Sequence, residues 1–272
     1  MNITKRVLAT AAVVGMTAAT FVASTGPAAA ATDPVKQAYV AATAKMVPVT
    51  KISQTIPLKK AAPRGGSVVF FYNGTPAAQY LADGIKQAAS LGGWSFDQIT
   101  YSPNNTATLQ QAMMNALQKK PTAVILSSQD PSTWGPAVTA AYAAAKVPII
   151  AGATCPIQQS GPIFPGAATC AQSVLVGRTL ADWFIADSKG TGSMVFQSMP
   201  VFNSFVAIRD AFMAEVKSKC KACKVQIVET TLSQAASGQI PTIMVNALRA
   251  NPGATYLFFD NAAWSTGIMP AL

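Results

Sequence analysis

The sequence of 272 residues contains no histidine. Histidine is the most frequent general base in enzymes and the most frequent metal ligand in proteins. Its absence removes the Ser-His-Asp and Cys-His pairings, and no G-x-S-x-G segment is present. One S-x-x-K match, Ser218 to Lys221, lies at the basic end of a predicted helix, and we attribute it to chance. The sequence therefore predicts a protein without catalytic activity, cofactor or metal site.

Acidic residues are also scarce, with 10 against 20 basic residues and a formal net charge of +10. Such a balance suits an anionic ligand, a cell wall or an acidic membrane surface. The lysines are spread along the chain, however, and no aromatic residues alternate with them. This distribution argues against a nucleic-acid partner and favours solvated charge.

The amino-terminal segment has the pattern of a secretory signal peptide. Lys5 and Arg6 form a positive start, residues 7–22 are apolar and small, and residues 28–30 fit a cleavage site. No later stretch approaches the ~20 consecutive apolar residues of a membrane span. The cleavage site has no cysteine that would carry a lipid anchor. We therefore predict export to the periplasm, the cell envelope or the medium, with residues 1–30 as the signal peptide.

The four cysteines are Cys155, Cys170, Cys220 and Cys223. An even number in an exported chain predicts disulfides. Of the three pairings, we favour Cys155–Cys170 and Cys220–Cys223, because each closes a local loop. Redox chemistry of the C-x-x-C pair is an alternative, but the pair follows a basic helix and does not open a helix that would lower a thiol pKa. A zinc site built from all four is a further alternative with irregular spacing.

The remaining pattern predicts the fold class. Residues 31–66 form an amino-terminal extension, with a short helix followed by a proline-rich linker. From Ser67 apolar strands alternate with amphipathic helices, and the alternation restarts after an irregular segment at 154–170. Such strands are typical of a parallel sheet covered by helices on both faces. We predict an α/β protein with two doubly wound, Rossmann-like lobes, residues 67–169 and 170–272.

Two such units after a signal peptide resemble the type I periplasmic binding proteins, the ribose-binding-like solute receptors of ABC importers. The segments that carry this resemblance are VVFFYNGTPAAQYLADGIKQAASLGG, PTAVILSSQDPSTWGPAVTAAYAAAKVPIIAGAT and NPGATYLFFDNAAWSTGIMPAL. The resemblance implies two lobes that close on a small ligand and a surface for a transporter permease, in a protein we expect to be monomeric. It also implies an incomplete second lobe, because chains of this family continue past the last segment. We therefore expect a truncated member.

The resemblance also implies where the ligand binds, since ligands of open α/β sheets lie at the carboxyl ends of the strands. The implied ligand-binding residues are Asn73, Thr75, Gln129, Asp130, Thr154, Phe202, Asn203, Phe205, Asn261 and Trp264. Sugar-binding relatives carry stacking aromatics and an Asp-Arg pair where this sequence has Ala77-Ala78 and Gly152-Ala153. The ligand is therefore either sugar-like or a bulkier, more apolar molecule. Core packing by the phenylalanines, turn formation by the asparagines and helix capping by Asp130 are the alternative roles.

These expectations favour an exported solute-binding protein that delivers a small molecule to an ABC importer. A ligand-sensing partner of a membrane receptor shares the same fold and is the first alternative. An exported hydrolase is the second, and the missing catalytic motifs speak against it.

Overall fold

The computed structural model describes residues 33–272 except 49, 51–56, 58, 62 and 104. The predicted signal peptide lies outside the described residues. Within this described part of the chain, no helix is both long and apolar enough to cross a bilayer.

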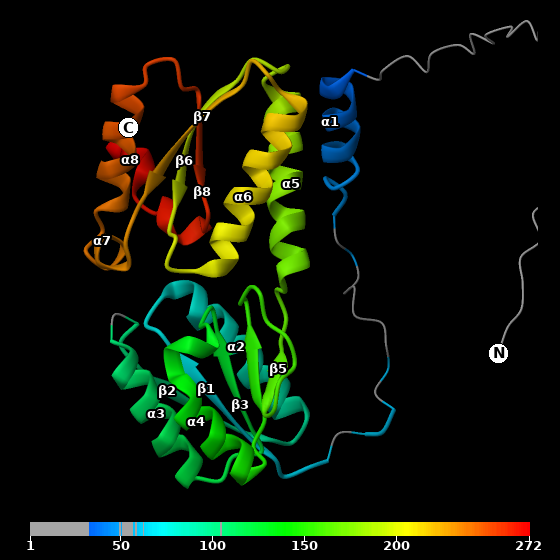
Figure 1. Cartoon of the computed structure of the whole chain (residues 1–272), viewed down its shortest axis with the longest axis vertical. Helices are drawn as coiled ribbons and strands as arrows, with labels where there is room; N and C mark the ends of the chain where they lie inside the picture. The colour runs from blue at the N-terminus through cyan, green and yellow to red at the C-terminus, as the bar shows by residue number, and fades with distance from the viewer. Residues whose placement is uncertain (1–32, 49, 51–56, 58, 62, 104) are drawn as a thin grey trace, which may run out of the picture. The chain divides into compact units, whose positions relative to one another are not determined.

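The first sheet has five parallel strands in the order β2-β1-β3-β4-β5 (Figure 1), and we call this sheet with its helices lobe 1. Its elements are β1 (Ser67–Tyr72), α2 (Pro76–Leu91), β2 (Ser95–Thr100), α3 (Thr106–Gln118), β3 (Ala123–Ser127), α4 (Pro131–Ala145), β4 (Ile149–Gly152) and β5 (Ile163–Pro165). Side chains alternate across the sheet, so Val69 and Phe71 pack under α3 and α4, whereas Phe70 packs under α2. The lobe is thus a three-layer αβα unit.

The second sheet has three parallel strands in the order β7-β6-β8, and we call this sheet with its helices lobe 2. Its elements are α5 (Cys170–Asp187), β6 (Ser193–Ser198), α6 (Asn203–Lys219), β7 (Lys224–Glu229), α7 (Leu232–Ala236), α8 (Ile240–Ala250), β8 (Tyr256–Phe259), the 3-10 helix η1 (Ala262–Ser265) and α9 (Ile268–Ala271). Phe196 faces α5 and α6, and Val195 faces α8. The prediction of an α/β fold with two parallel sheets is confirmed, and the second sheet is the smaller.

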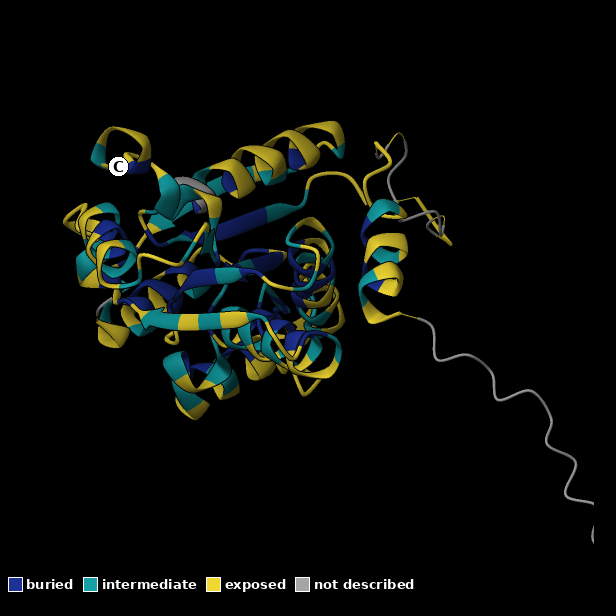
Figure 2. Cartoon of the chain, turned by 90° about the horizontal axis from the view of Figure 1, so that it is seen from above, coloured by how far each residue is buried: buried dark blue, intermediate teal, exposed yellow. Residues whose placement is uncertain are grey.

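Local chemistry explains where these elements begin and turn. Strand β1 lies inside its sheet, between β2 and β3, and its four middle residues are all buried, as its continuous apolar run predicts. Helix α2 begins with Pro76 after Thr75, whose hydroxyl accepts a hydrogen bond from the Ala78 N–H. Helix α4 is kinked at Gly135, whose φ of 75° lies in the region that glycine tolerates best. Figure 2 shows the result, with buried positions on the inner strands and exposed positions on the outer helix faces, whereas β2, β7 and β8 have intermediate and exposed positions.

Two elements, β5 and α7, carry little signal in the sequence. Strand β5 is short and ends in Pro165, so it lacks the apolar run that identifies the others. Helix α7 has only five residues and therefore no measurable periodicity. In α8, Pro241 lies in the first turn, where the missing N–H costs nothing.

The amino-terminal extension is not only a linker. Helix α1 (Pro34–Thr43) belongs to the core of lobe 2 although it precedes lobe 1 in the sequence. It packs along α5, as Figure 1 shows, and its Ala38 is completely buried there. Helix α1 and the elements from α5 onward therefore belong to one lobe, although β1 to β5 lie between them in the sequence.

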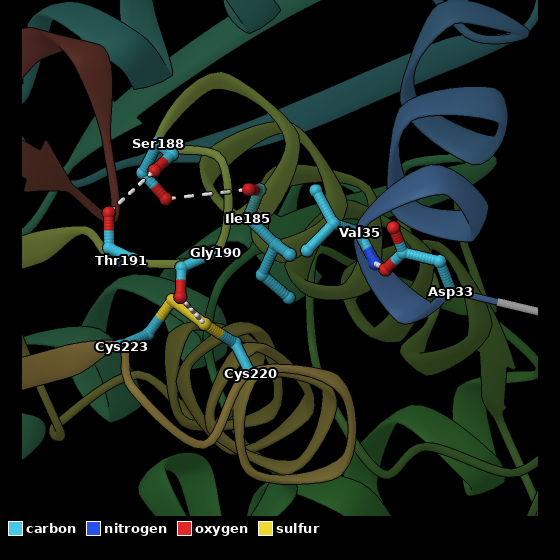
Figure 3. Close-up of a disulfide and its surroundings, with 8 residues drawn as sticks. All are labelled: Asp33, Val35, Ile185, Ser188, Gly190, Thr191, Cys220 and Cys223. Atoms are coloured by element: carbon cyan, nitrogen blue, oxygen red, sulfur yellow. Dashed lines mark hydrogen bonds between the residues drawn. A yellow bond between two sulfur atoms is a disulfide. The ribbon is translucent and has the colours of Figure 1, made fainter.

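Both favoured disulfides are formed, Cys155–Cys170 and Cys220–Cys223. The second lies beside the loop that follows α5 (Figure 3), and Cys220 Sγ is 3.1 Å from the carbonyl oxygen of Gly190. A disulfide sulfur has no hydrogen, so this is a close sulfur–oxygen contact and not a hydrogen bond. On the other side of Gly190, a Cβ atom would come within 2.8 Å of Val35 Cγ2 of α1. Gly190, in the loop after α5, thus lies between α1 and the disulfide.

Candidate ligand-binding site

The strand ends of both lobes meet at a cavity of about 110 Å³. Lobe 1 contributes the loops after β2, β3 and β4, and lobe 2 contributes the loops after β6 and β7. Five of the predicted residues line it, namely Gln129, Asp130, Thr154, Phe202 and Asn203. This location agrees with the rule that ligands of open α/β sheets lie beyond the carboxyl ends of the strands.

Asp130 has two roles in this cavity. Its Oδ1 accepts a hydrogen bond of 2.9 Å from the Ser132 N–H, which caps α4. Its Oδ2 accepts a hydrogen bond of 3.3 Å from Asn203 Nδ2, and Asn203 opens α6 in lobe 2. The alternative prediction, that Asp130 caps a helix, is therefore correct. The same carboxylate also makes a polar contact with lobe 2.

The lobe 1 side of the cavity is held in an unusual backbone conformation. Ser128 and Ala153 both have positive φ, 58° and 49°, which non-glycine residues adopt rarely. Hydrogen bonds hold these loops, because the Ser128 N–H donates to the Gly152 carbonyl and Thr154 Oγ1 donates to the Gln129 carbonyl at 2.9 Å. Strained residues that surrounding contacts hold in place are typical of functional sites.

A second cavity of about 410 Å³ adjoins the first, and both are lined by Pro103 and Leu232. The predicted residues Asn73, Thr75 and Trp264 lie here. Asn73 Oδ1 accepts hydrogen bonds from the N–H and hydroxyl of Thr75, so it shapes the turn before α2. Among the described residues, the Asn73 amide nitrogen donates no hydrogen bond, so a ligand can accept from it.

Two predicted residues line neither cavity. Phe205 packs in the core of lobe 2 and makes an edge-to-face contact with Phe202, with ring centroids 5.2 Å apart. Asn261 uses its Oδ1 to accept a hydrogen bond of 2.9 Å from the Ala263 N–H, and so it caps η1. Phe202 is itself only 5% exposed, so it belongs to the core as well as to the cavity wall.

Other lining residues were not among the predicted ligand-binding residues: Pro103, Thr106, Ser128, Thr133, Ala153, Val201 and Leu232 at the first cavity, and Gly74, Ala235 and Ala236 at the second. Pro103 and Thr106 follow β2, and Leu232 follows β7. The strand-end rule that selected Gln129 and Thr154 applies equally to them. Applying it to every strand would have found these three.

The charges around the cavities restrict the ligand. Among the described lining residues, Asp130 is the only charged side chain, and no lysine or arginine is present. An anionic ligand would therefore meet a carboxylate without a compensating cation. The remaining groups are hydroxyls, amides and apolar side chains. That combination suits a neutral ligand with several hydroxyl groups.

Asp260 lies behind this site, at the carboxyl end of β8, and is 8% exposed. Its Oδ2 accepts a hydrogen bond of 2.6 Å from the Met199 N–H. Burial raises the pKa of Asp260 to about 7, although the Met199 N–H, the Gln197 amide and the Trp264 indole each lower it. The Asp260 Oδ1 and the Trp264 indole Nε1 are both buried, and neither has a regular hydrogen-bond partner among the described residues.

Comparison with known proteins agrees with this architecture. Residues 66–272 match the family described as periplasmic binding protein domain. No curated protein sequence matches the chain. Many solved structures share the fold, among them a 5-methylthioribose transporter solute-binding protein from Thermotoga lettingae, in complex with 5-methylthioribose. That protein is 12% identical, with a TM-score of 0.63, and the match covers 75% of this chain and 62% of that one.

Two further structures are similar. A sugar ABC transporter protein from Yersinia enterocolitica is 15% identical with a TM-score of 0.65, covering 77% of this chain and 62% of that one. An ABC transporter solute-binding protein from Actinobacillus succinogenes, with bound D-allose, is 14% identical with a TM-score of 0.60, covering 77% and 73%. This chain thus spans less than two thirds of the length of the Thermotoga lettingae and Yersinia enterocolitica proteins.

Proposed function

We propose that this chain, which belongs to the periplasmic binding protein domain family, is an exported receptor for a small, neutral, hydroxyl-rich solute such as a sugar. The family consists of binding proteins and not of enzymes. The observation that carries the proposal is the cavity at the strand ends, where polar side chains from both lobes converge and no cation is present among the described lining residues.

Several findings support the sugar-like ligand. Hydroxyl groups of a sugar both donate and accept, and the cavity offers the Asp130 carboxylate and the amides of Gln129 and Asn203 for such bonds. The similar solved proteins bind 5-methylthioribose and D-allose. Phe202 and Trp264 supply apolar surface for the faces of a ring.

The family suggests an ABC importer as the partner to which the receptor delivers its ligand. The two disulfides support an oxidising compartment outside the cytoplasm. A sensing role beside a membrane receptor is the alternative function, and capture of the loaded protein by transporter membrane components would separate the two. We expect the receptor to act as a monomer.

The experiment is a thermal-shift screen with D-allose, D-arabinose and 5-methylthioribose, set against D-glucuronate and D-arabinonate as anionic counterparts. We expect at least one neutral compound to raise the melting temperature, because a ligand that binds only the folded state stabilises it. Thr154→Val should reduce this shift, while the exposed Asp83→Asn should leave it unchanged. Stabilisation by the anionic compounds alone, or by none of the five, would contradict the proposal.

A further inference from the structure

Asp260 has an unusual environment for an acidic residue. It is buried at the carboxyl end of β8 and lines neither cavity. A buried carboxylate is costly unless hydrogen-bond donors compensate it. The contacts around Asp260 show which parts of the site this buried carboxylate holds in place.

The first contact leads to the main cavity. Asp260 Oδ2 accepts the 2.6 Å hydrogen bond from the Met199 N–H, and Met199 is completely buried. Met199 starts the loop after β6, and this loop carries Val201, Phe202 and Asn203 to the cavity wall. Asp260 therefore holds the first residue of the loop that supplies the lobe 2 side of the cavity.

A second set of contacts joins the neighbouring strand ends. The Asp260 N–H donates to Gln197 Oε1 at 3.2 Å, and Gln197 Nε2 donates to Thr230 Oγ1 at 2.8 Å. Gln197 lies on β6, Thr230 directly follows β7, and both are buried. Two residues after Thr230, Leu232 lines both cavities. One buried polar layer thus connects the ends of all three strands of the lobe 2 sheet.

We propose that Asp260 is a positioning residue, which fixes the loop after β6 in the arrangement that forms the lobe 2 half of the site. Its role in ligand binding rests on the proposed function, whereas its role in holding the loop does not. An ionised carboxylate is the stronger acceptor for the Met199 N–H, since charge-assisted hydrogen bonds are shorter and roughly twice as strong as neutral ones. Loop order therefore depends on the ionisation of this group.

The surroundings of Asp260 place that ionisation near neutrality. Burial raises its pKa to about 7 against the three hydrogen-bonding groups that lower it. Among the described residues, no charged side chain contributes to this shift, whether from β6, β7 or the η1 segment. The loop after β6 should accordingly be held firmly at pH 8 and more loosely at pH 6.

The test follows the Met199 amide by nuclear magnetic resonance while the pH is varied without ligand. In the wild-type protein we expect its proton resonance to move with a midpoint near the pKa of Asp260, about 7, and to lie further downfield at high pH. In Asp260→Asn this titration should disappear, while the amide oxygen still accepts from Met199. In the matched control Asp182→Asn, another buried acid of lobe 2, the titration should persist.

Amide hydrogen exchange provides the second measurement. After correction for intrinsic rates, residues 201–203 should exchange several-fold faster at pH 6 than at pH 8 in the wild type and equally in Asp260→Asn. A Met199 resonance that titrates unchanged in Asp260→Asn, or does not titrate in the wild type, would overturn the proposal. Should Asp260→Asn fail to fold, the wild-type and Asp182→Asn titrations decide alone. Because no ligand is used, this outcome is independent of the sugar screen.

Discussion

The carboxylate of Asp130 in lobe 1 accepts a hydrogen bond of 3.3 Å from the side-chain amide of Asn203 in lobe 2. Each residue also stands at the beginning of a helix, Asp130 as the cap of α4 and Asn203 as the first residue of α6. The contact between the lobes is thus made by side chains whose positions are fixed by helix starts. The Asp130 carboxylate therefore has two functions, capping α4 and contacting lobe 2, and substitutions can distinguish them.

Asp130→Ala should destabilise the protein by about 1 kcal/mol, because the cap of α4 is lost. Asp130→Ser retains a capping oxygen, so the free energy of unfolding should stay close to that of the wild type, and only the contact with Asn203 should be lost. Urea denaturation monitored by circular dichroism measures both. Equal destabilisation by alanine and serine would show that capping is not the stabilising role of Asp130.

Gly190 should be sensitive to substitution for two reasons. Its φ is 76°, and a Cβ atom would lie within 2.8 Å of Val35. Gly238 has a similar φ of 67° with nothing within 4 Å of its would-be Cβ, which makes it a matched control. Gly238→Ala should cost about 1 kcal/mol from backbone strain alone. Gly190→Ala should cost more and should also increase hydrogen exchange in α1. Equal effects of the two substitutions would contradict a packed Val35–Gly190 contact.

Helix α1 should be part of the folded core and not a detachable extension. Ala38 is completely buried against lobe 2, while Val40 of the same helix is 59% exposed. Ala38→Glu would bury an unpaired charge and should release α1 or lower the free energy of unfolding by several kcal/mol, roughly 3–5. Val40→Glu should change it by less than about 0.5 kcal/mol. Limited proteolysis near residue 44 reports the release directly, and identical cleavage of both variants would refute the core role of α1.

Asp260 should make stability depend on pH in an unusual direction. Its pKa is about 7 in the folded chain and about 3.9 when unfolded, so between these values the folded chain binds a proton that the unfolded chain has lost. The contribution of Asp260 to the free energy of unfolding should therefore fall as the pH rises from about 4 to about 7, by a few kcal/mol at most. The difference in stability between the wild type and Asp260→Asn isolates this contribution. A difference that is constant over this range would show that Asp260 is not shifted.

The sequence predicts this fold well because parallel strands buried on both faces appear as continuous apolar runs. The run from Ser67 to Tyr72 identifies β1 without ambiguity, whereas the three residues of β5 include Pro165 and carry no such signal. The docking of α1 on α5 could not be predicted, because its alanines report only that one face is buried and not against which lobe.

The site is predicted less completely than the fold. Strand ends locate Gln129, Asp130 and Thr154, because parallel strands end at one edge of their sheet. Loop conformation decides the rest, and it turns Asn261 to cap η1 while Trp264 reaches the second cavity. The polar layer under the site depends on burial that one sequence does not display, so no positioning role for Asp260 was predicted.

The central claim is that the cavity shared by the two lobes binds a neutral, hydroxyl-rich solute. Native mass spectrometry of the purified chain, incubated with D-allose, D-arabinose, D-glucuronate and D-arabinonate together, tests it most directly. We expect an adduct with the mass of a neutral sugar, which is lost when Asp130→Ser and Asn203→Ala are combined and retained in Asp83→Asn. Adducts of the acids alone, no adduct at all, or an adduct that survives in the double variant would contradict the claim.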